Sequence, residues 1–270
     1  MGARSSDGFG RMPFSPKAVL PDTTVACARP QVLAVVASTD LARGLAHDPA
    51  TRPDGFVIEG EIAGGHNAPP RGPHREDDYG QPIYDERDEV DLPAILALGL
   101  PVWLAGGYGT PEGLRSALAL GATGVQVGTT FAFCDESGFT PSIKAQVRTL
   151  AGSGDLVVRS DWRASPTGFP FRVAQVPDTL SDPSISSARK SVCDLGVLRT
   201  AYLSGKGEVD FRCPAEPETA YLRKGGREVN RTGRVCLCNA LLASAGLGQV
   251  RPGGVVEPPL VTSGTDLSGV

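Results

Sequence analysis

The chain has 270 residues, a hydrophobic share of 40% and a formal net charge of −4 at pH 7. This hydrophobic share is typical of globular proteins and argues against disorder throughout the chain. Lys and Arg form no basic cluster, and no apolar run approaches the roughly 20 residues of a membrane-spanning helix, so nucleic acids and membranes are excluded as expected partners.

An irregular leader is predicted for residues 1–30, where Gly, Ser, Pro and Arg mix without periodicity. This segment lacks the apolar core of a secretory signal, so we expect a cytoplasmic protein. The first strand is predicted at Val32–Ala37, a continuous apolar run suited to a strand buried on both faces. A helix is expected next, capped by one of the polar residues 38–40 and carrying Leu41 and Leu45 on its buried face.

The alternation of strand and helix recurs three more times along the chain. The further strands are predicted at Phe56–Ile62, Pro101–Ala105 and Gly124–Phe133. A helix signal follows each of them: Asp91 caps the first helix, and Thr110 and Thr140 each precede a proline that opens the next two. Their buried stripes are expected to hold Ile95, Leu96, Leu114, Ala117, Leu118, Gly121, Ile143, Val147 and Leu150. Four βα units in a row predict an α/β fold with a parallel sheet.

Beyond about Gly154 the periodicity weakens. Strands are predicted at Leu156–Arg159 and Phe171–Ala174, one helix within Ser181–Leu203, and a loose end over residues 251–270. We therefore divide the chain into the leader, a βα domain over residues 31–153 and a partly ordered extension over residues 154–270.

Glycines lie where the last two predicted strands end. Gly106 and Gly107 follow the third predicted strand, and Gly128 and Thr129 lie within the fourth. The carboxyl ends of parallel strands meet at one edge of the sheet, and glycine lets backbone N–H groups approach an anion closely. These residues predict a phosphate site, although tight turns alone would also account for a Gly-Gly pair.

Three motifs carry a resemblance to a known family. They are Glu59-Gly-Glu-Ile-Ala-Gly-Gly-His66, Pro101-Val-Trp-Leu-Ala-Gly-Gly107 and Gly121-Ala-Thr-Gly-Val-Gln-Val-Gly-Thr129. In this order and spacing they resemble the nitronate monooxygenase (2-nitropropane dioxygenase) family, which shares an FMN-dependent TIM barrel with flavin enoyl-ACP reductases. The resemblance covers about Val32 to Leu150 and implies strands five to eight of that barrel. A full barrel takes about 250 residues, so we expect an incomplete half-barrel followed by an irregular C-terminal extension.

The resemblance also implies roles for particular residues. His66 would be the base that takes the α-proton from a nitroalkane, a task that suits an imidazole with a pKa near neutrality. A loop histidine that only hydrogen-bonds the backbone is the alternative interpretation. The implied FMN-binding residues are Glu59, Gly64, Gly106, Gly107, Gln126, Val127, Gly128 and Thr129. Ile62 departs from the family pattern, since many relatives carry Glu there, which leaves the choice of substrate open.

The resulting hypothesis is an FMN-dependent oxidoreductase that oxidises a nitroalkane or nitronate with O2. A flavin-dependent enoyl-ACP reductase-like enzyme is an alternative, but it needs an NAD(P)H site that the sequence does not reveal. A non-catalytic half-barrel fragment or subunit is another, because four parallel strands cannot close on themselves. A homodimer or a complementary half-barrel chain would then complete the structure.

Two further features of the sequence invite a functional interpretation. The long polar loop after the second strand, which contains Asn67 and Arg71, is either a lid over the site or a solvated surface loop. Four cysteines gather in the extension, at positions 193, 213, 236 and 238. Because they lack paired C-x2-C spacing, we expect no metal site and interpret them as reduced thiols, with Cys27 and Cys134 as packing residues.

Overall fold

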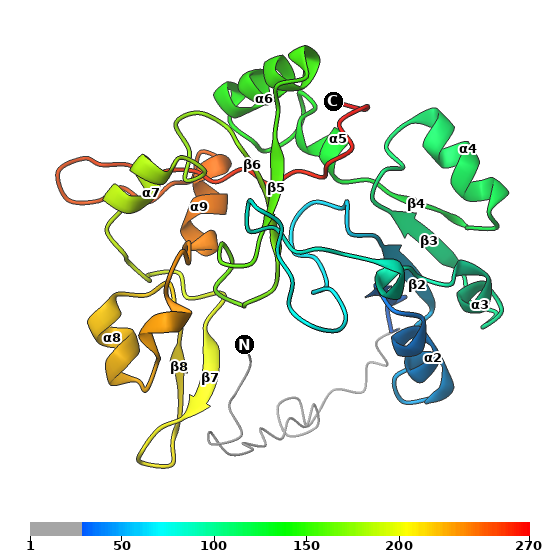
Figure 1. The fold of residues 1–270 in the computed structure, drawn as a ribbon, viewed down its shortest axis with the longest axis horizontal. Helices are drawn as coiled ribbons and strands as arrows, with labels where there is room; N and C mark the ends of the chain where they lie inside the picture. Colours follow the sequence, from blue (N-terminus) through cyan, green and yellow to red (C-terminus); the bar gives the residue numbers. More distant parts are fainter. Residues whose placement is uncertain (1–28) are drawn as a thin grey trace, which may run out of the picture.

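A four-stranded parallel sheet organises the first half of the chain (Figure 1). The computed structural model describes residues 29–270, so Cys27 and nearly all of the predicted leader lie outside the described residues. The strands are β1 (Leu33–Val36), β2 (Gly55–Glu59), β3 (Val102–Ala105) and β4 (Gly124–Gln126). They lie side by side in chain order, and each neighbouring pair is parallel. The predicted α/β class with a parallel sheet is confirmed, and the sheet stays open with β1 and β4 as its edges.

Three helices cover one face of this sheet (Figure 1). They are α2 (Thr39–His47), α3 (Leu92–Leu96) and α4 (Pro111–Ala119). Their predicted caps are confirmed, because the side chains of Ser38, Asp91 and Thr110 each accept a hydrogen bond from a backbone N–H in the first turn. Between helices and sheet lies an apolar core that contains Phe56, which is fully buried.

The buried stripes of α2 and α4 differ from the prediction. Ala117 is fully buried and Leu45 packs half-buried against the core, as predicted. Leu41 is 50% and Leu118 is 48% exposed, however, and the fully buried Ala42 takes the place expected for Leu41. Small side chains let a helix backbone approach the sheet closely, and the larger leucines then flank the contact instead of filling it. The stripe of α6 (Pro141–Ser153) agrees with the prediction, since Ile143 and Val147 are both buried.

The opposite face of the sheet is partly open. Leu33 is 41% and Val35 is 54% exposed on β1, so the prediction that this strand is buried on both faces was wrong. Further along the same face, Val57 is buried and Trp103 half-buried. Within residues 29–270, packing covers the centre of this face better than its β1 edge.

Two predicted strands end earlier than expected. β2 ends at Glu59, because Ala63 donates its N–H to the carbonyl of Gly60 and turns the chain. β4 ends at Gln126, and the chain enters the short helix α5 (Thr129–Ala132) instead of continuing as a strand to Phe133. Gly128, with φ −112° and ψ −59°, is the residue that changes the direction of the chain.

The extension is more regular than predicted. Two antiparallel hairpins and three short helices follow α6, together with a 3-10 helix; a second 3-10 helix, η2 (Glu86–Asp88), lies in the long loop. The elements of the extension are β5 (Val158–Asp161), β6 (Phe171–Ala174), α7 (Pro183–Ala188), β7 (Thr200–Leu203), β8 (Val209–Arg212), α8 (Glu218–Arg223), η3 (Glu228–Asn230) and α9 (Leu237–Ser244). The one helix predicted within Ser181–Leu203 is present as α7, and the rest of that segment forms loop and β7. The strand predicted at Phe171–Ala174 is confirmed.

Residues 251–270 were predicted to be loose, and this prediction was also wrong. Leu260 and Val261 are fully buried or nearly so, in two apolar clusters shared with α6, β6 and α9. The N–H of Ala174 donates to the carbonyl of Val261 at 2.9 Å. The segment then runs back from the extension to α5 (Figure 1), so the end of the described chain returns to the carboxyl edge of the sheet.

Replacing Phe56 by Ala should lower the free energy of unfolding by about 3 to 5 kcal/mol, because it leaves a cavity between the helices and the sheet. Leu118→Ala on α4 is the matched control and should cost less than about 1 kcal/mol, since that side chain is half exposed. Urea unfolding followed by circular dichroism measures both changes, and equal losses would contradict this assignment of the core.

Candidate functional site

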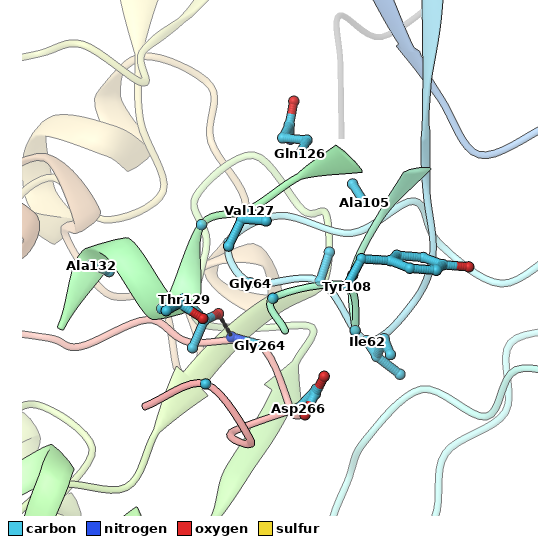
Figure 2. Close-up of a pocket in the computed structure, with 18 of the residues that line it drawn as sticks. Ile62, Gly64, Ala105, Tyr108, Gln126, Val127, Thr129, Ala132, Gly264 and Asp266 are labelled. Carbon is cyan, nitrogen blue, oxygen red and sulfur yellow. Dashed lines mark hydrogen bonds between the residues drawn. The ribbon is translucent and has the colours of Figure 1, made fainter. Parts of the chain in front are cut away.

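A cavity of about 290 Å³ lies at the carboxyl edge of β2, β3 and β4 (Figure 2). All eight residues expected to bind FMN line it: Glu59, Gly64, Gly106, Gly107, Gln126, Val127, Gly128 and Thr129. The parallel register explains why they meet, since Glu59 pairs with Ala105 and Ala105 pairs with Gln126 at the same level of the sheet. The sequence motifs therefore converge on one cavity.

The glycines of this cavity bring backbone close to its interior. Gly106 and Gly107 have φ values of 85° and 77°, a left-handed conformation that side chains disfavour. A Cβ added to Gly107 would lie 2.9 Å from Ile62 Cδ1, whereas one added to Gly128 would meet no atom within 4 Å. Gly128 therefore borders open space, and because it has no side chain, a ligand can approach its backbone directly.

The C-terminal segment supplies a wall of the cavity that sequence reasoning missed. The N–H of Gly264 donates to Thr129 Oγ1 at 2.8 Å (Figure 2). The N–H of Thr265 donates to the carbonyl of Ile62 at 3.0 Å. Gly65 donates its N–H to Thr262 Oγ1 at 2.8 Å. The sequence did offer one signal that this segment is packed. Leu260 and Val261 are consecutive apolar residues just before the polar ones, and such a pair is typical of a segment that is buried in a core.

His66 lies outside this constellation. Its Nε2 is 2.6 Å from Ser165 Oγ, and its ring packs edge-on against Phe171 with centroids 4.8 Å apart. Burial lowers the pKa of the imidazole below its usual value, so the ring is neutral near pH 7. His66 lines neither the first cavity nor the neighbouring one, and its predicted role as the base stays a prediction.

A second cavity, of about 490 Å³, lies beside the first under the long loop after β2. The two cavities share the lining residues Glu59, Ile62, Ala105, Gly106 and Tyr108. Arg71, one of the two loop residues selected from the sequence, lines the second cavity and donates to the carbonyls of Ala37 and Arg87. Asn67, the other, is buried and donates to the carbonyl of Ala63 at 3.1 Å. The loop thus covers the second cavity; Arg71 ties it to the end of β1, and Asn67 ties it to the turn after β2.

Glu59 stands where the two cavities join. It is the last residue of β2, and burial raises the pKa of its carboxyl above the usual value. Within residues 29–270 its carboxylate has neither a hydrogen-bond donor nor a cationic partner. A half-buried carboxylate without a partner is costly in a folded protein, which marks this position as a functional candidate.

The four cysteines of the extension come together away from both cavities. They are Cys193, Cys213, Cys236 and Cys238. Cys236 hydrogen-bonds to Cys238, and this bond together with backbone N–H groups of the nearby loop lowers the pKa of the Cys238 thiol below its usual value. All four are free thiols, and in the described part of the chain no group of three or more His, Cys, Asp or Glu side chains is placed to hold a metal ion. Nor is any described helix long and apolar enough to cross a membrane.

Comparison with known proteins gives relatives for the first part of the chain. A protein described as a probable nitronate monooxygenase from Bacillus subtilis is 34% identical over 102 residues, which are 35% of this chain and 25% of the relative. A nitronate monooxygenase from Pseudomonas aeruginosa is 33% identical over 165 residues, covering 58% of this chain and 43% of the relative. The chain thus spans less than half the length of these curated relatives.

Two solved structures show partial likeness. FabK from Thermotoga maritima is 28% identical, with a TM-score of 0.37 over 54% of this chain and 40% of that one. A nitroalkane oxidase from Streptomyces ansochromogenes is 27% identical, with a TM-score of 0.37 over 53% of this chain and 38% of that one. The family model for nitronate monooxygenase matches residues 19–169, more than half of the chain. By this match, and by the motifs that line its cavity, the protein belongs to the nitronate monooxygenase family.

Proposed function

We propose that this chain is an FMN-dependent oxidoreductase of the nitronate monooxygenase type, which oxidises a nitroalkane or nitronate with O2. The observation that carries the proposal is the convergence of all eight expected cofactor residues on one cavity. Family membership supports an oxidoreductase in general. The substrate, the cofactor and the cytoplasmic location belong to the proposal.

The residues of the first cavity fit the phosphate end of FMN. Gly128 borders open space, so a phosphate can approach its backbone, and the Thr129 hydroxyl can donate to an anion while its oxygen accepts from Gly264. The second cavity, joined at Glu59, leaves room for the ring and a small substrate. Bound FMN would accept electrons from the substrate and pass them to O2, while the protein holds and orients both.

Two alternatives remain within this proposal. An enoyl reductase-like enzyme would use the same phosphate site but needs a place for NAD(P)H, and neither cavity offers a second phosphate cradle of glycines. A subunit that acts only with a second copy or a complementary half-barrel is favoured by the open β1 edge, where Val35 is exposed.

The purified chain should bind FMN and consume O2 with nitroethane as substrate. A flavin absorption spectrum with close to one FMN per chain, together with O2 uptake at an oxygen electrode, would support the proposal. A chain that binds FMN but oxidises NADH with an enoyl thioester instead would favour the reductase, and a chain without flavin affinity would contradict the cofactor assignment.

Gly128→Leu should weaken FMN binding by at least 10-fold, because the new side chain enters open space in the phosphate cavity without requiring a strained backbone. Riboflavin, which lacks the phosphate, should bind the variant and the natural chain with more similar affinities. Quenching of flavin fluorescence on titration measures both ligands.

Gly138→Leu is the matched control, since Gly138 is exposed, lies outside both cavities and has equal room for a side chain. It should leave FMN binding unchanged. If the two variants bind FMN equally well, the phosphate does not sit beside Gly128.

Val35→Lys should reduce self-association of the chain, because it places a charge on the open apolar face beside Leu33. Sedimentation velocity compares the oligomeric states. Leu118→Lys adds the same charge on the helix-covered side, at a residue of similar exposure, and should leave association unchanged. A natural chain that is monomeric at all concentrations would remove the homodimer and leave a complementary chain as the proposed partner.

A further inference from the structure

Four cysteines from three separate segments of the extension meet at the start of α9. Cys193 lies in the loop before β7, Cys213 follows β8, Cys236 is the residue before α9, and Cys238 lies in its first turn. Cys213 and Cys236 are buried, and the side chains of Cys193 and Cys238 pack against them. None of the four lines either cavity, so the proposed flavin site leaves this cluster unexplained.

Two of these sulfur atoms are already in contact. The S–H of Cys236 donates a hydrogen bond to the sulfur of Cys238, and Leu237 alone separates the two residues in the chain. Cα atoms two positions apart lie within about 7 Å of each other, and closer in a helical turn, which is the range that a disulfide bridges. The pair can therefore pass between dithiol and disulfide without a large movement of the backbone.

The surroundings favour the thiolate form at Cys238 and the thiol form at its neighbours. The bond from Cys236 and two backbone N–H groups of the loop before β7 lower the pKa of Cys238 below its usual value. Burial raises the pKa of Cys213 to about 11, and it also raises the pKa of Cys193. Cys238 is half-buried whereas Cys236 is only 4% exposed, so a small molecule from solvent reaches the thiolate first.

A buried cation beside the cluster has a spare hydrogen-bond donor. The Arg189 side chain is 9% exposed, its Nε donates to Glu257, and its buried Nη2 has no partner. The hydrogen bond to Cys238 raises the pKa of Cys236, whereas the charge of Arg189 acts in the opposite direction. Once Cys238 is bonded to another sulfur it no longer carries negative charge, and Arg189 then favours the thiolate at Cys236.

We propose that Cys236 and Cys238 form a thiol–disulfide exchange site that takes a small organic disulfide as its substrate. The Cys238 thiolate attacks one sulfur of the small disulfide, a new S–S bond forms, and the other half leaves as a thiolate. Cys236 then gives its proton to solvent, and its sulfur attacks the sulfur of Cys238. This step closes the disulfide between the two cysteines and releases the second half as a thiolate. The protein pair loses two electrons, and the small disulfide gains them and becomes two thiols.

The reduced natural chain should consume one equivalent of oxidised glutathione and release two of reduced glutathione. After incubation without O2, the remaining thiols are alkylated with iodoacetamide and the peptides are mapped by mass spectrometry. Cys236 and Cys238 should be joined and escape alkylation, while Cys193 and Cys213 should be recovered in alkylated form. A disulfide between other cysteines, or no reaction with oxidised glutathione, would overturn the proposal.

Two serine variants separate the attacking thiol from the resolving one. Cys236→Ser keeps the attacking thiol, so it should accumulate one glutathione bound to Cys238. Cys238→Ser should react with oxidised glutathione roughly 10-fold more slowly or worse, because the thiol that remains in the pair is buried. Equal rates for the two variants, or no mixed disulfide in Cys236→Ser, would contradict the assigned order of attack.

Cys134→Ser is the matched control and should leave the reaction unchanged. Cys134 is half-buried like Cys238 but lies outside the cluster, and its Sγ donates to the carbonyl of Phe131 at 3.1 Å. The natural chain also allows a comparison that needs no substitution and so cannot be confused with misfolding. At pH 7, Cys238 should react with iodoacetamide roughly 10-fold faster than Cys134. Slower alkylation at Cys238 would count against its role as the attacking thiol.

Metal analysis of the purified natural chain gives the last test. The four thiols should react without prior treatment with a chelator, and the chain should contain far less than one zinc ion per molecule. About one zinc per chain, with thiols that react only after chelation, would show that the cluster is a metal site and would overturn the proposal.

Discussion

The parallel pairing of four strands is the constraint on which the site depends. In such a sheet every carboxyl end points to one edge, so residues that are distant in sequence arrive at one level without any contact between their own loops. Glu59, Ala105 and Gln126 occupy neighbouring strands in this way. The glycines that follow two of these strands then line the cavity at the same edge, where the proposed phosphate would lie.

Glycine also decides where the extension meets the sheet. A Cβ on Gly64 would lie 2.9 Å from the nitrogen of Gly264, and one on Gly264 would lie 2.9 Å from the carbonyl oxygen of Ile62. The two chain segments therefore touch backbone to backbone, a distance that side chains would prevent. This contact closes the cavity on the side that the sheet leaves open, and it explains why the extension belongs to the architecture of the site.

Local signals in the sequence were sufficient for part of this picture. Caps such as Asp91 and Thr110 act within one helical turn, so their residue types predict the starts of α3 and α4. The glycine motifs likewise predicted which residues share a cavity, because the carboxyl ends of parallel strands all lie at one edge of the sheet. The features that the sequence could not predict depend on contacts with residues far away in the chain. Leu118 has the right spacing for a buried stripe, but its burial depends on what packs beside α4.

The orientation of His66 could not be predicted either, because it too depends on residues far away in the chain. Spacing places it after a Gly-Gly turn, but the direction of its ring is set by Ser165 and Phe171, about a hundred residues further along the chain. The exposed face of β1 could not be foreseen either, because an apolar run has the same pattern whether or not a partner covers it. Side-chain direction and coverage are tertiary properties, and propensity carries little information about them.

The wall built by residues 262–266 has a consequence for assembly of the site. Gly264 leaves the ribosome 135 residues after the Thr129 that it contacts, so a nascent chain can complete its sheet while the cavity still lacks one side. Capture of the proposed cofactor would then wait for the extension to dock, and docking and capture would stabilise each other through mass action. Substitutions deep in the extension would thereby weaken retention of the proposed cofactor without changing any residue that lines the cavity.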